Sequence, residues 1–125
     1  MDREGFQDWL DSYGRAWESK EHNAFVNLFT DNASYYANPF SEPLSGHTAI
    51  LDHWSNVIRS QDQIRFNYEV LAVTHDSGVA HWWASFVHIS SKTKVRLDGI
   101  FVVSLDSENH CRVLKQWWYW LEYSS

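Results

Sequence analysis

The sequence predicts an α+β domain in which three helices are followed by a four-stranded antiparallel meander. In the first half, apolar residues recur at spacings of three and four, which is the period of an amphipathic helix. From Ile64 onward, apolar and polar residues alternate with a period of two, and short polar turns separate the alternating runs. With 125 residues and neither a linker nor an internal repeat, the chain is expected to form one domain over residues 1–125.

Three helices are expected before the alternating region. The first covers about residues 3–19, and a short second helix follows the polar break at 19–23. The third begins at Ser45 or Gly46, both of which suit a helix N-terminus, and ends at 60–62. The inward residues expected on these helices are, in order, Phe6, Trp9, Leu10, Tyr13 and Trp17, then Phe25, Leu28 and Phe29, then Ile50, Trp54, Val57 and Ile58.

Turn residues set the limits of the expected strands. Asp31-Asn32 predicts a turn before a short strand at 33–37, and a loop with two prolines follows at 38–46. The strands of the meander are expected at 64–70, 79–89, 95–105 and 112–120.

The last strand carries four consecutive aromatic residues, Trp117 to Trp120. Successive side chains of a strand point to opposite faces, so large rings occupy both faces of this one. Both faces therefore need a cover. The helices can cover one face, and a second sheet or a second copy of the protein is expected to cover the other.

Composition excludes some classes of function and favours others. The net charge of −6 argues against a nucleic-acid partner, because phosphate binding needs clustered Lys and Arg. Aromatic residues make up 17% of the chain, and rings are well suited to fill a wide space or to wall a pocket. The single cysteine, Cys111, excludes an intramolecular disulfide and is expected to be a small buried thiol.

No metal and no cofactor are expected from the ligand-type residues. The chain has seven histidines, but none of them forms a pair with metal-ligand spacing. His47 and His53 are six residues apart on one predicted helix and so lie on different faces. His81 and His88 are separated by an odd number on one predicted strand and point to opposite faces.

The sequence also bears on the compartment. The first residues contain no basic run followed by an apolar segment, so no signal peptide is expected. No apolar run approaches the roughly 20 residues that a membrane span needs. A cytoplasmic protein with no membrane partner is therefore expected.

Several short motifs resemble those of one superfamily. The quoted stretches are Leu28-Phe29-Thr30-Asp31-Asn32-Ala33, Asn38-Pro39, Glu42-Pro43 and Gly46-His47-Thr48-Ala49-Ile50. In residue type and spacing they resemble the SnoaL-like branch of the nuclear transport factor 2-like superfamily, and the resemblance covers nearly the whole chain. It implies a strongly curved, mostly antiparallel sheet that packs against the helices as a cone with an internal cavity. It also implies a homodimer, because many members dimerise through the outer face of the sheet.

The implied cone divides the strand residues into an inner and an outer set. If Trp120 points inward, the alternation takes Trp118, Gln116 and Leu114 with it. A small hydrophobic or aromatic ligand is then expected to contact Tyr13, Trp17, Phe29, Asn38, Phe40, Trp54, Trp82, Phe86, Phe101, Gln116, Trp118 and Trp120. The homodimer interface is expected to contain Trp83, Ser85, Val87, Trp117 and Tyr119.

Two of the polar residues in the inner set have alternative interpretations. Gln116 needs a hydrogen-bond partner because it lies among apolar residues, and a ligand or an ordered water is expected to supply it. Asn38 either orients a ligand carbonyl or stabilises the turn at its own position.

The resemblance to ketosteroid isomerase, a member of the same superfamily, is incomplete at the catalytic positions. That enzyme uses a tyrosine on its first helix, a carboxylate base and a protonated carboxylic acid. Tyr13 matches the tyrosine, but the base position falls on Asn38 or Ala37 and the acid position on Gly99. Asp98 is one residue away from the acid position and is expected to point to the other face, where Arg96 offers an ion pair. The usual steroid isomerase mechanism is therefore not expected.

Three hypotheses of function remain open. In the first, which the residues favour, the protein binds a small hydrophobic ligand and performs no chemistry. In the second it is an enzyme, in which Tyr13 polarises a carbonyl group and His53 or Asp98 moves a proton. In the third it is a dimerisation module whose own rings fill the cavity.

Overall fold

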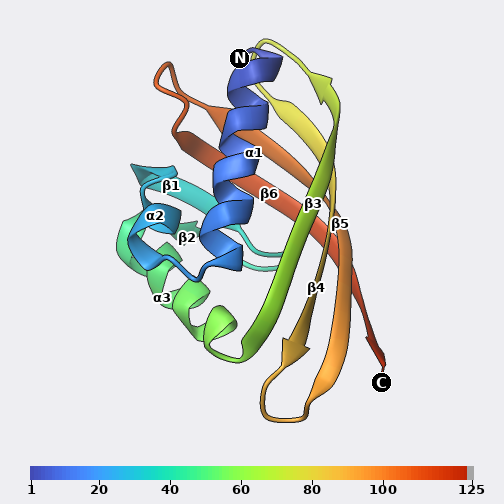
Figure 1. The fold of residues 1–125 in the computed structure, drawn as a ribbon. Helices are drawn as coiled ribbons and strands as arrows, with labels where there is room; N and C mark the ends of the chain where they lie inside the picture. Colours follow the sequence, from blue (N-terminus) through green and yellow to red (C-terminus); the bar gives the residue numbers. More distant parts are fainter. Residues whose placement is uncertain (124–125) are drawn as a thin grey trace.

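The computed structural model describes residues 1–123 and has the predicted α+β architecture. The helices lie on one side of a single curved six-stranded sheet (Figure 1), so that helices and sheet together form a cone. The helices are α1 (Arg3–Glu18), α2 (His22–Val26) and α3 (Gly46–Arg59). The strands are β1 (Phe29–Tyr36), β2 (Leu44–Ser45), β3 (Gln61–Val73), β4 (Gly78–His88), β5 (Thr93–Leu105) and β6 (Cys111–Tyr123).

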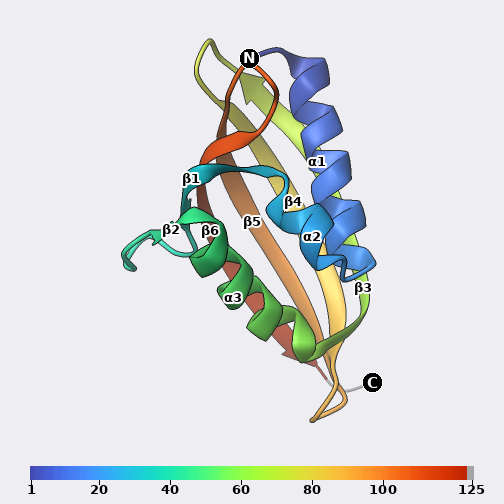
Figure 2. The same cartoon turned by 90° about the vertical axis from the view of Figure 1, so that its left-hand side faces the viewer.

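The sheet combines the predicted meander with strands from the first half of the chain. Its order is β2-β1-β6-β5-β4-β3, and β3 to β6 pair antiparallel as predicted. β1 pairs parallel with β6, and β2 pairs antiparallel with β1. Because α1 packs on β3 and α3 packs on β1, the two long helices lie over opposite parts of the sheet (Figure 2).

The helix starts follow from local chemistry. The Asp2 carboxylate accepts a hydrogen bond from the backbone N–H of Gly5 and caps the N-terminus of α1. Ser45 occupies the N-cap position of α3, and Gly46 follows it with a φ of 85°, a left-handed conformation that glycine adopts at little cost.

The structure corrects the prediction for residues 28–37. The predicted turn at Asp31-Asn32 is wrong, because both residues lie within β1, and Phe29 begins this strand instead of ending a helix. The cause is a long-range contact. Phe29 pairs in parallel with Cys111, whose N–H donates to the Leu28 carbonyl at 2.7 Å. The pairing register shifts after Phe29, which leaves Asp31 and Asn32 exposed beside the ladder.

The curvature of the sheet has a visible cause in β3. The register with β4 shifts between Asp62 and Arg65, and Gln63 inside this irregularity has a φ of 52°. A bulge of this kind bends its strand and increases the local twist. The concave side of the bent sheet faces the helices and encloses the core.

Aromatic rings form much of that core. Phe101 is fully buried, stacks on Trp82 with ring centroids 5.0 Å apart and meets the edge of Tyr13 at 5.3 Å. Cys111 is buried, and burial raises the pKa of its thiol, which agrees with the predicted unreactive role. Among the described residues, no helix has both the length and the apolar character that crossing a membrane requires.

Candidate functional site

A cavity of about 400 Å³ lies between the helices and the concave face of the sheet. Its lining runs from the buried Tyr13 and Tyr35 to Trp120, which is 60% exposed, and we infer from this gradient that the mouth lies at the Trp120 end of the cavity. Aromatic rings dominate its lining: Tyr13, Trp17, Tyr35, Trp54, Trp82, Phe86, Trp118 and Trp120. The size suits a small organic molecule of a few rings.

Strand register explains why these rings gather on one face. Trp82, Gly99 and Trp118 are paired directly across β4, β5 and β6. Gly99 leaves room in this row, since a Cβ there would lie 3.0 Å from Trp82 Cε2 and 2.4 Å from the Trp117 carbonyl oxygen. The Trp82 indole can therefore lie across β5, where any other residue would displace it.

Two tyrosines provide hydroxyl groups at the inner end of the cavity. Tyr13 on α1 and Tyr35 on β1 are both buried. Burial, together with the neighbouring Tyr35, raises the pKa of Tyr13 well above its usual value, and burial raises the pKa of Tyr35 to about 12. Both hydroxyls thus keep their protons at neutral pH and can donate hydrogen bonds. Tyr35 was not predicted as a site residue, although its inward position follows once the parallel pairing of β1 is known.

Gln116 finds its hydrogen-bond partner within the protein. Its amide nitrogen donates to the backbone carbonyl of Ala37 at 2.8 Å, and Trp118 Nε1 donates to the same oxygen at 2.9 Å. The predicted ligand or water partner is therefore not needed for this nitrogen. The pair of bonds ties the inner face of β6 to the end of β1 and holds Gln116 and Trp118 in the cavity wall.

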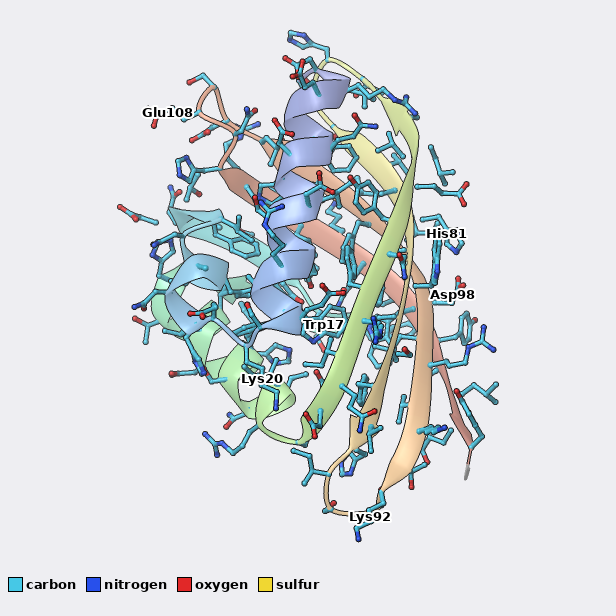
Figure 3. All side chains as sticks on the ribbon, viewed as in Figure 1. Trp17, Lys20, His81, Lys92, Asp98 and Glu108 are labelled. Carbon is cyan, nitrogen blue, oxygen red and sulfur yellow. The ribbon has the colours of Figure 1, made fainter. Side chains whose placement is uncertain are left out.

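Gln61 is a cavity residue that the sequence analysis missed. It is 4% exposed, and its Oε1 accepts a hydrogen bond of 2.8 Å from Trp17 Nε1. Figure 3 shows Trp17 near the C-terminal end of α1, between the helix and the sheet. The stretch Ser60-Gln61-Asp62 predicts only the end of the third helix, and no local signal in it indicates a buried amide.

One polar atom of the cavity wall has no partner. Trp82 is 3% exposed, and among the buried side-chain nitrogen and oxygen atoms of residues 1–123 its Nε1 is the one without a hydrogen bond. An unpaired buried donor of this kind is uncommon in folded proteins and needs an explanation.

Titratable groups lie on the helix side and at the mouth of the cavity. His53 on α3 is partly buried, and desolvation lowers its pKa, so its imidazole is neutral at neutral pH. His88 and Glu122 complete the lining near the mouth. Both were missed, yet the same alternation that gave Trp82, Phe86 and Trp120 reaches them two residues further along β4 and β6.

Asn38 borders the cavity but uses its side chain to shape the loop. Its Oδ1 accepts hydrogen bonds from the backbone N–H groups of Phe40 and Ser41, at 2.9 and 3.0 Å. Its amide nitrogen also donates to the Ser41 hydroxyl at 2.8 Å. The turn-stabilising interpretation therefore describes this residue.

Four predicted site residues lie away from the cavity. Phe40 is 97% exposed in the loop between β1 and β2. Phe29 and Phe101 are buried in the core and do not reach the cavity surface. Asp98 lies on the opposite face of the sheet, since the inward residue of this part of β5 is Gly99. A strand residue cannot reach the far face without a bulge, and β5 has none at this point.

On the outer face, Asp98 takes part in a small polar cluster. His81 Nε2 lies 3.0 and 3.1 Å from the two Asp98 carboxylate oxygens, and His81 Nδ1 lies 3.4 Å from Glu69 Oε2. Figure 3 shows His81 and Asp98 on the side of the sheet away from α1. The hydrogen bond that the His81 ring donates to the Asp98 carboxylate is the main cause that raises the pKa of His81. The sequence predicts Arg96 as the partner of Asp98. This prediction is wrong, because Asp98 pairs with His81.

Apolar residues surround this cluster on the outer face. The predicted interface residues Trp83, Trp117 and Tyr119 are 37%, 45% and 85% exposed, and Leu121 and Tyr123 extend the same row along β6. Ser85 and Val87 are partly exposed on β4. All of them lie opposite to the cavity, as the alternation predicted, and their contact with a second subunit stays a prediction.

Among residues 1–123, no group of three or more His, Cys, Asp or Glu side chains has an arrangement that could hold a metal ion. The arrangement at the cavity instead offers hydroxyl and indole donors, a neutral imidazole and a large apolar wall. Such a set can bind an uncharged molecule and orient a polar group on it.

Comparison with known proteins places this fold. The sequence profile of the SnoaL-like domain family matches residues 7–112. The chain belongs to the SnoaL-like family. No curated protein matches it by sequence.

Solved structures similar to this SnoaL-like protein cover nearly its whole length. One of them is SalBIII, an epoxide hydrolase/cyclase-like enzyme with a role in pyran ring formation in the polyether salinomycin. It has a TM-score of 0.82 at 17% identity, with 94% of this chain and 93% of that chain covered. A computationally designed 17-OHP binder has a TM-score of 0.82 at 14% identity, with 95% and 97% covered. The Delta 5-3-ketosteroid isomerase of Mycobacterium sp. has a TM-score of 0.81 at 12% identity, with 95% and 98% covered. At these identities the similarity establishes the shared fold.

Proposed function

We propose that this SnoaL-like protein binds a small hydrophobic or aromatic ligand in its internal cavity. The observation that carries the proposal is a cavity of about 400 Å³ whose wall is mostly aromatic and whose polar groups are few. Apolar burial supplies most of the binding free energy in a site of this kind, and a few polar groups set the orientation of the ligand.

The free volume favours ligand binding over a cavity filled by the protein's own rings. Trp17, Trp82 and Trp118 pack in the cavity wall and leave the space between them open. Two of these indoles are tied down by hydrogen bonds to Gln61 and to the Ala37 carbonyl, which keeps them from collapsing inward. The existence of a 17-OHP binder and of enzymes on the same fold is consistent with this use of the cavity.

A catalytic function is the second candidate, and His53 is the observation that favours it. Its neutral imidazole borders the same cavity as the Tyr13 hydroxyl, so a base and a hydrogen-bond donor are both present. Among the described residues that line the cavity, the carboxylate is that of Glu122. It lies at the mouth and not beside Tyr13. The inner end of the cavity therefore holds donors without a carboxylate base, and ligand binding is the better-supported proposal.

The test of ligand binding uses fluorene, an uncharged hydrocarbon of three fused rings, in equilibrium dialysis. Saturable binding of one fluorene per chain is expected. Leu97→Trp places an extra ring inside the cavity and is expected to abolish it. Ile100→Trp adds the same ring on the outer face of β5 and serves as the control that retains binding. Fluorene binding that survives Leu97→Trp in a folded protein would contradict the proposal.

A further inference from the structure

At the mouth of the cavity, a carboxylate lies next to a pair of indole rings. Trp118, Trp120 and Glu122 occupy alternate positions of β6, so their side chains share the inner face, and all three line the cavity. The ring centroids of Trp118 and Trp120 are 5.5 Å apart, and the ring planes are inclined by 42°. Trp120 and Glu122 are both exposed, so a ligand that enters from solvent can contact them.

The Glu122 carboxylate has no counter-charge in the described part of the chain. None of the ion pairs within residues 1–123 involves it. Its neighbours across the sheet are apolar, since Glu122 is paired with Val95 on β5 and Val95 with Phe86 on β4. A positively charged group of a ligand would therefore be the first partner of this carboxylate.

The charges around the cavity favour a cation over an anion. The described lining contains no Lys and no Arg, and Glu122 is its one carboxylate. The His53 imidazole is neutral because desolvation lowers its pKa. The whole chain has a net charge of −6, which adds a long-range attraction for cations.

Indole rings beside a carboxylate are suited to bind an ammonium group. The face of an indole attracts a cation through the quadrupole of the ring, and the carboxylate adds a direct charge attraction. The position at the mouth matters, because an ammonium group there keeps part of its hydration. The same charge among the inner rings would lose its hydration without a partner. The apolar body of such a ligand would point inward and the charge outward.

We propose that the ligand is an amphiphilic amine, with an aromatic body inside the cavity and a protonated amino group at the mouth, between the Glu122 carboxylate and the rings of Trp118 and Trp120. The inference rests on the proposed function, because it names the class of molecule that the cavity takes. Glu122 thereby distinguishes an amine from an alcohol or a carboxylate on the same ring body.

The test compares 4-phenylbenzylamine, 4-phenylbenzyl alcohol and biphenyl-4-carboxylate, which share one biphenyl body. Equilibrium dialysis is done at pH 8, where an alkyl amine is protonated and a histidine of ordinary pKa is neutral. The amine is expected to bind about tenfold more tightly than the alcohol, and the carboxylate is expected to bind most weakly. Glu122→Gln removes the charge and keeps the shape. It is expected to weaken amine binding about threefold to fivefold and to leave alcohol binding unchanged.

Glu108→Gln is the matched control, because it makes the same change of charge at an exposed glutamate in the turn between β5 and β6. Figure 3 shows Glu108 at the end of the molecule opposite to the C-terminus, far from the end of β6 that carries Glu122. This variant is expected to leave all three affinities unchanged. Circular dichroism checks that both variants are folded.

The outcomes separate this inference from the proposed function. If neither fluorene nor any biphenyl compound binds, both proposals fail. If fluorene binds but the amine binds no better than the alcohol, or if Glu122→Gln leaves amine binding unchanged, the cavity takes ligands without selecting amines and this inference alone fails. An equal loss of amine binding in Glu108→Gln would show that net charge attracts the amine, which would also overturn the assignment to Glu122.

Discussion

At the scale of single residues, the buried hydrogen bonds of the cavity wall decide which side chains stay in place. Gln61 has its side chain among aromatic rings because Trp17 Nε1 donates to it at 2.8 Å. Removing only one partner leaves the other partner buried without a hydrogen bond. Removing both partners leaves no unpaired polar group. This asymmetry makes the pair a direct test of the observed geometry.

Gln61→Leu is expected to lower the free energy of unfolding by about 1–3 kcal/mol, since the Trp17 N–H loses its acceptor. Trp17→Phe in the same background removes the unpaired donor, so the double variant is expected to lose less than the sum of the two single losses. Urea unfolding of the four proteins measures this coupling. Strictly additive losses would show that the two side chains do not interact.

At the scale of elements, strand pairing places charged groups side by side on the outer face. Glu69 on β3, His81 on β4 and Asp98 on β5 come from three consecutive strands. The neighbouring carboxylates favour the protonated imidazole, so the pKa of His81 in the folded protein is above its usual 6.5. The protonated His81 imidazole therefore stabilises the folded protein fully below pH 6.5, and this stabilisation is lost as the pH rises through the raised pKa.

A titration of the His81 ring protons by NMR is expected to give a midpoint above 6.5. Asp98→Asn removes the charged acceptor at 3.0 Å and is expected to lower this midpoint. Asp62→Asn, a change to an exposed carboxylate on the edge strand β3 that does not contact His81, is the control that leaves it unchanged. A midpoint at or below 6.5 in the unmodified protein would contradict the observed ion pairs.

At the scale of the whole molecule, the outer face of the sheet is expected to bind a second copy of the chain. Trp83, Trp117 and Tyr119 together expose large rings on this face, while the cavity lies on the other. Large exposed apolar patches commonly mark protein–protein interfaces. We therefore propose a homodimer that buries this face and leaves each cavity intact.

Trp117→Lys is expected to convert the dimer into a monomer. A lysine buried without a partner costs about 3–5 kcal/mol, which weakens association by a factor of a hundred or more. Size-exclusion chromatography with light scattering is expected to give 14.7 kDa for this variant and twice that mass for the unmodified protein. Phe40→Lys makes the same kind of change at a fully exposed ring in the loop before β2 and should keep the dimer mass. An unchanged mass for Trp117→Lys would remove the assignment of this interface.

The sequence by itself determined the elements whose periodicity is local. The helical stripe from Phe6 to Trp17 predicted α1, and strict alternation predicted β3 to β6 and the two faces of β6. Because side-chain direction follows from the period alone, the inward positions of Trp82, Gln116 and Trp118 were predicted correctly. The same rule, continued by one repeat, also covers His88 and Glu122.

Only the tertiary structure decided the features that depend on contacts between distant segments. The parallel pairing of β1 with β6 joins Phe29 to Cys111, and no local pattern records such a pairing. The same is true of the Gln61 partner, 44 residues away, and of the Ala37 carbonyl that satisfies Gln116 from 79 residues away. An amide side chain among apolar strand residues predicts that a hydrogen-bond partner is needed. Which group serves as the partner of that amide is decided only when the sheet closes around the cavity.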